Sequence, residues 1–88
     1  MAIDTLTRFW FIFERFAHPT PLNLGCGVTG RDYEDALQIV RDTVFTRGAP
    51  RIIQCIEGID VSTLDPKHVL PNIGDVTRRG VWFPQGYS

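Results

Sequence analysis

The amino-acid sequence predicts an α+β fold: a single mixed or antiparallel sheet of about four strands with one long helix packed on one face. Three observations lead to this prediction. Segments 7–16 and 51–61 are rich in β-branched and aromatic residues. Segment 22–28 alternates apolar residues with small or polar ones, and segment 31–46 repeats its apolar residues at helical spacing. The expected order is β-β-α-β-short helix-β, within one domain that spans residues 1–88.

The first predicted strand, "TRFWFIFERF", is apolar on both sides. Phe9, Phe11 and Phe13 share one face, while Trp10 and Ile12 share the other. A strand of this kind belongs in the middle of a sheet, where both of its faces are covered. The following residues, 17–21, contain two prolines and are predicted to form a hairpin loop.

The second predicted strand, 22–28, has one apolar face and one face that is almost bare. The apolar face carries Leu22, Leu24, Cys26 and Val28. The other face includes Gly25 and Gly27, and glycine inside a strand often marks a close approach to the backbone. The bare backbone leaves room for a large aromatic side chain of the neighbouring strand, such as Trp10 or Phe11.

The helix is predicted at about residues 31–46. Thr29 and Asp32 form a pair like a capping box, and Gly48 and Pro50 stop the helix. Its apolar stripe consists of Tyr33, Ala36, Leu37, Val40 and Val44.

The remaining predicted elements are a third strand at 51–61, a short helix or 3₁₀ turn at 62–70, and a last strand at 79–84. The third strand has apolar residues on both faces, which predicts a central position. One helix covers only one face of the sheet, so something else must cover the second face. The alternatives are residues 62–77, a second copy of the chain, or a different protein.

Composition narrows the function classes. The net charge is −1, which argues against nucleic acid or an anionic membrane as a partner. The longest apolar run, 9–13, is far shorter than the ~20 residues of a membrane helix, so a cytoplasmic protein is expected. Cys26 and Cys55 are expected to be reduced and buried. The histidines and nearby aspartates lack the spacing of metal ligands, and no cofactor is expected.

Gly25-x-Gly27-x-x-Gly30 has the spacing of a dinucleotide-binding loop. The strand interpretation explains the apolar alternation of this segment, whereas the loop interpretation explains only the glycines. We therefore predict no nucleotide site. Free N–H groups at the start of the helix leave an anion site open as an alternative, with Gly27, Thr29 and Gly30 as its residues.

The C-terminal stretch "TRRGVWFPQGY" mixes arginines with aromatic residues, as binding hot spots do. Strand alternation places Val81 and Phe83 in the core and turns Trp82 towards the second face or a partner, partly exposed. The predicted partner-binding residues are Arg78, Arg79, Trp82, Tyr87 and Trp10. The alternative is a terminal strand that simply fills the core.

The leading hypothesis is a small non-enzymatic protein-binding module, of inhibitor or immunity type, that occupies another protein or a second copy of itself. The alternative is a small enzyme or an anion- or nucleotide-binding domain that uses the Gly25–Gly30 stretch and the following helix N-terminus. Its pocket would lie between that helix end and residues 62–77, with Cys26, Asp65 or His68. A concave pocket with convergent polar groups favours the second hypothesis, and a flat patch the first.

Overall fold

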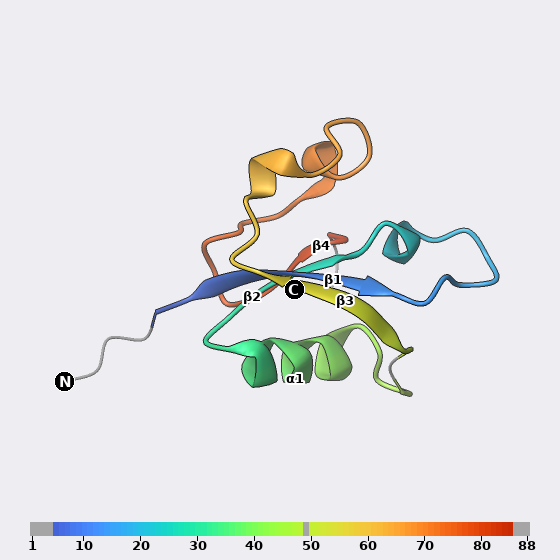
Figure 1. Cartoon of the computed structure of the whole chain (residues 1–88), viewed down its shortest axis with the longest axis horizontal. Coiled ribbons are helices and arrows are strands. Elements are labelled where there is room, and N and C mark those ends of the chain that lie inside the picture. The colour runs from blue at the N-terminus through green and yellow to red at the C-terminus, as the bar shows by residue number, and fades with distance from the viewer. Residues whose placement is uncertain (1–4, 49, 86–88) are drawn as a thin grey trace.

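The computed structural model describes residues 5–48 and 50–85, which form one four-stranded sheet with one α-helix. The strands are β1 (Thr7–Phe13), β2 (Cys26–Gly30), β3 (Ile52–Glu57) and β4 (Gly80–Phe83). They lie in the order β3-β1-β2-β4, and all neighbours are antiparallel. The helix α1 (Tyr33–Thr43) packs on one face of the sheet (Figure 1). The predicted α+β fold is confirmed, with a helix of only 11 residues.

β1 is central, as predicted, and separates two apolar clusters. It pairs with β3 on one side and with β2 on the other. Phe9, Phe11 and Phe13 are buried on the side of α1, whereas Trp10 is buried on the opposite side. Because its side chains point alternately to opposite faces, β1 contributes residues to both apolar clusters.

The second face is covered by the chain's own residues 59–76, which include two 3₁₀ turns, η2 (Val61–Thr63) and η3 (Leu70–Asn72). Ile59 and Val69 are buried there against the aromatic side chains of the sheet. Figure 1 shows this segment on the side of the sheet opposite to α1. Of the three predicted alternatives, the chain itself provides the cover.

The second strand is shorter than predicted because its first residues form a 3₁₀ turn, η1 (Pro21–Asn23). The hydroxyl of Thr20 accepts a hydrogen bond from the N–H of Leu22 and caps this turn. Leu22 is buried, but Leu24 is 42% exposed. The connection from β1 therefore runs over residues 14–25 rather than 17–21, and the alternation holds only from Cys26 onward.

The helix begins two residues later than predicted because Asp32, and not Thr29, caps it. The Asp32 carboxylate accepts a hydrogen bond from the N–H of Asp35 at 2.8 Å. Thr29 belongs to β2 and donates its hydroxyl proton to the carbonyl of Val76 at 2.7 Å. The pair like a capping box is therefore Asp32 with Asp35, three residues along the chain.

The predicted central position of β3 is wrong, since β3 is an edge strand. Every residue of β2 is buried, whereas no residue of β3 is. A register shift between Ile12 and Phe13 leaves Ile53 as an extra residue of β3, and Ile53 is 64% exposed. β3 thus carries apolar side chains on both faces, although neither face of this strand is fully covered.

A bulge also changes the direction of side chains in β4. Gly27 pairs with Phe83 and Val28 with Val81, so Trp82 is the extra residue on β4. Val81 packs on the side of α1, while Trp82 and Phe83 both pack on the second face. The prediction that Val81 and Phe83 share a face is wrong for this reason.

Candidate functional site

Trp82 and Trp10, two of the predicted partner-binding residues, lie inside the second core. Trp82 is 1% exposed and Trp10 5%, and their rings stack with centroids 5.9 Å apart. The expectation that Trp82 is partly exposed is wrong, because residues 59–76 cover the face towards which it points. Both tryptophans therefore stabilise the fold, and the surface of the protein is built from other residues.

The two glycines of β2 and its entry provide the space for these rings. A Cβ atom at Gly27 would lie 2.3 Å from the Trp82 ring, and one at Gly25 would lie 2.5 Å from the Trp10 ring. Gly25 also has a φ of 138°, which L side chains rarely adopt. The close aromatic approach predicted from the bare strand face is found for Trp10, and packing explains the glycine spacing.

Residues proposed for an anion site also have packing roles. Gly27 lies under Trp82, Thr29 is 1% exposed with its hydroxyl bonded to Val76, and Gly30 packs against the backbone of Ala36. At the start of α1, the carboxylate of Asp32 accepts a hydrogen bond from the N–H of Asp35, and the carboxylate of Asp35 accepts one from the N–H of Arg31. Side chains of the protein itself therefore occupy the position that an anion would take.

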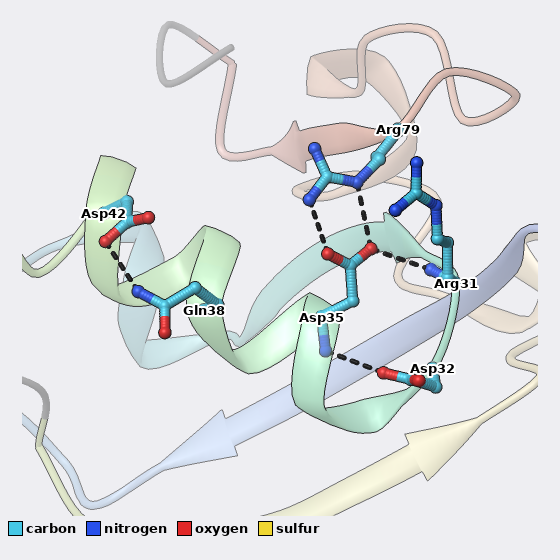
Figure 2. A network of polar contacts seen from close by, with 6 residues as sticks. All are labelled: Arg31, Asp32, Asp35, Gln38, Asp42 and Arg79. Atoms are coloured by element: carbon cyan, nitrogen blue, oxygen red, sulfur yellow. Dashed lines mark hydrogen bonds and ion pairs between the residues drawn. The ribbon is translucent and has the colours of Figure 1, made fainter.

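Asp35 is the centre of a polar network that ties α1 to the segment before β4 (Figure 2). Its carboxylate accepts hydrogen bonds from the Arg31 N–H at 2.9 Å, from Arg79 Nε at 2.9 Å and from Arg79 Nη2. The bonds from Arg79, then the Arg31 N–H, lower the pKa of Asp35 to about 2. This bidentate pair fixes Arg79, one of the predicted partner-binding residues.

A groove of about 750 Å³ lies between α1 and the segment that leads into β4. The α1 side contributes Gln38, Ile39, Asp42 and Thr43. The opposite side contributes Gly74, Asp75, Arg78, Arg79, Gly80, Val81, Trp82 and Gln85. The groove is therefore concave, with polar and apolar groups in its lining and three of the predicted binding residues, Arg78, Arg79 and Trp82, among them.

The two arginines of the groove differ in what holds them. Arg79 is engaged by Asp35, whereas the Arg78 side chain makes no hydrogen bond or ion pair with any residue in 5–48 or 50–85. Asp75, the nearest acid along the chain, accepts hydrogen bonds from the Thr77 hydroxyl and N–H, which lower its pKa, and the charge of Arg78 lowers it further. Gln38 donates to Asp42 at 2.8 Å. The Arg78 side chain is thus exposed and interacts with Asp75 through charge alone, without a hydrogen bond.

The three residues named for the enzyme hypothesis do not come together in one site. Cys26 lies in the core on the side of α1, and burial raises the pKa of its thiol to about 12. His68 and Asp65 bond to each other at 3.1 Å on the exposed segment over the opposite face. None of the three lines the groove, which contains no cysteine or histidine. Concave polar geometry is present, but without a thiol or imidazole to act as nucleophile or base.

The remaining observations concern absences and comparisons. In the described part of the chain, no three His, Cys, Asp or Glu side chains are grouped to hold a metal, and no helix could span a membrane. Tyr87 lies outside the described residues. Comparisons with protein-family models, with curated proteins and with solved structures give no match for this chain. The function is therefore inferred from the groove and the residues that line it.

Proposed function

We propose that this chain is a small non-enzymatic protein-binding module that docks an acidic segment of a partner protein in the groove between α1 and β4. The observation that carries the proposal is Arg78, an exposed arginine in the groove lining whose side chain forms no hydrogen bond or ion pair with a described residue. Guanidinium groups bind carboxylates through paired, charge-assisted hydrogen bonds. A carboxylate of the partner would bind Arg78 in the way that Asp35 binds Arg79.

The remaining lining suits an extended polar segment. The side chains of Gln38, Thr43 and Gln85 donate hydrogen bonds within the chain and leave their oxygen atoms as acceptors, while Ile39 and Val81 add apolar surface. Polar groups around an apolar centre are typical of protein interfaces. Occupying a partner in this way is how inhibitor and immunity-type proteins act, and it needs no catalytic group. The two free cysteines suit the reducing cytoplasm, where we expect the module to work.

The test is selection of binders from a random peptide library displayed on phage. We expect the wild-type chain to enrich peptides that contain Asp or Glu. Arg78→Ala is expected to weaken the binding of a selected peptide by about 30-fold, since loss of an arginine hot spot costs ~2 kcal/mol or more. Arg47→Ala, which removes an exposed arginine in the loop after α1, is the matched control and should bind normally.

Two results would contradict this function. One is enrichment of peptides without acidic residues, and the other is binding that Arg78→Ala leaves intact. Binding of free inorganic phosphate with the same dependence on Arg78 would instead make the groove a small-anion site, at a place other than the Gly25–Gly30 stretch of the alternative hypothesis.

A further inference from the structure

The two edges of the sheet differ in the hydrogen bonding of their outer backbone groups. At the β4 edge, the N–H of Gly74 donates to the carbonyl of Trp82 at 2.8 Å, so the chain itself engages that edge. At the β3 edge, no strand in residues 5–48 or 50–85 pairs with the outer side. An unpaired edge presents a row of backbone donors and acceptors to another strand. The β3 edge is therefore open to strand addition.

An exposed apolar side chain lies on this edge. Ile53, the most exposed large hydrophobic residue of the described chain, is in β3 itself. Ile52, Cys55 and Ile56 of the same strand are only half-buried. No residue of β3 is buried within the single chain. Burial of β3 against a partner strand would remove apolar surface from water.

Charges at the ends of β3 select an orientation. Exposed Arg51 directly precedes the strand and exposed Glu57 ends it. If a second copy pairs antiparallel, Arg51 of each copy faces the Glu57 end of the other. Parallel pairing would instead bring like charges together, which destabilises a strand pair. The strand is therefore complementary to itself in the antiparallel sense.

The bulge at Ile53 does not remove this possibility. Bulges are one device that blocks edge pairing. Here the shift is confined to the start of β3, since Gln54, Cys55, Ile56 and Glu57 follow one another in regular register with β1. With Arg51 set against Glu57, this regular stretch of each copy lies opposite residues 51–54 of the other, so the contact includes the bulge at one end of each strand.

We propose that two copies of this chain associate through β3, antiparallel across a two-fold axis, and join their sheets into one. Such a contact is isologous, because each copy supplies the same strand. The groove is beside β4, at the opposite edge of the sheet order, so the dimer holds two grooves far apart and free. Because β3 is not part of the groove, dimer formation and peptide binding can fail independently.

The first test is sedimentation equilibrium over a range of protein concentrations. We expect a monomer–dimer equilibrium for the wild-type chain and for the control Leu24→Lys, which charges an exposed leucine outside β3. Ile53→Lys is expected to be monomeric, because it places two lysines in the interface. Its far-ultraviolet circular dichroism should match wild type, since Ile53 is exposed in the single chain. A wild-type chain that stays monomeric at millimolar concentration, or a dimer that survives Ile53→Lys, would overturn the proposal.

A charge exchange tests the orientation. Arg51→Glu and Glu57→Arg each turn two attractive contacts into repulsive ones, so each should weaken dimerisation by about tenfold. The double variant, and an equimolar mixture of the two single variants, should dimerise like the wild type. Single variants that dimerise normally, or a double variant no better than either, would overturn the antiparallel assignment.

Discussion

The indole rings of Trp10 and Trp82 lie where Cβ atoms at positions 25 and 27 would be. Each ring therefore depends on a glycine, and each glycine has a packing reason for its identity. The indole N–H of Trp82 is also the one buried side-chain polar atom without a hydrogen-bond partner in the described chain. Stacking and burial retain Trp82 despite that unsatisfied donor.

Gly27→Ala is predicted to lower the free energy of unfolding by about 1–3 kcal/mol, because the new methyl group would overlap a fully buried ring. Gly74→Ala is the matched control. A Cβ there meets the backbone of Trp82 at 3.9 Å, an ordinary contact, so its stability should equal that of the wild type. Urea denaturation measures both values.

A double-mutant cycle with Trp82→Phe tests the same contact from the other side. The smaller ring frees space over residue 27, so the two substitutions together should cost less than the sum of their separate costs. Strict additivity, or a harmless Gly27→Ala, would mean that Trp82 does not lie on Gly27.

At the scale of elements, the Asp35–Arg79 pair joins α1 to the start of β4, positions 44 residues apart in the sequence. The pKa of Asp35 is about 2 in the folded chain and close to 4 in an unfolded one. The folded state therefore binds fewer protons at Asp35. The pair contributes its full stability above about pH 4 and loses it as the pH falls towards 2.

Asp35→Asn is thus predicted to lower the free energy of unfolding by about 1 kcal/mol at pH 7, a value reduced for the solvent exposure of Arg79. The difference from the wild type should shrink as the pH falls from 4 to 2. Asp42→Asn, which alters an exposed carboxylate of the same helix, is the control. A difference that is constant over this range would show that Asp35 is not paired in its charged form.

Periodicity predicted the existence and type of β1, α1 and β4, and packing on both sides of β1 followed from its two apolar faces. The two bulges could not be predicted from the sequence. Alternation assumes that each residue pairs with one residue of the neighbouring strand, so it cannot reveal that Trp82 or Ile53 is an extra residue. The edge position of β3 was also missed, since an apolar strand has the same composition whether it is covered or self-associating. Of the site, Arg78 and Arg79 were found from residue type, whereas the α1 side of the groove depends on tertiary packing.

At the scale of the whole molecule, the chain covers both faces of its sheet, with α1 on one and residues 59–76 on the other. The surfaces that we propose for partners consequently lie at the two edges of the sheet: the groove beside β4 and the open strand β3. This closure within one chain decides where a partner can bind, because a second face covered by a partner would place the binding surface on the tryptophans instead.

Tryptophan fluorescence of the Ile53→Lys variant, which we expect to be monomeric, tests this closure, because both tryptophans of the chain, Trp10 and Trp82, lie in the second-face cluster. We predict blue-shifted emission that acrylamide quenches poorly, and a shift to red, quenchable emission only on unfolding in urea. Red-shifted emission that acrylamide quenches readily in the folded monomer would contradict it, since the second face would then be open to solvent until a partner covers it.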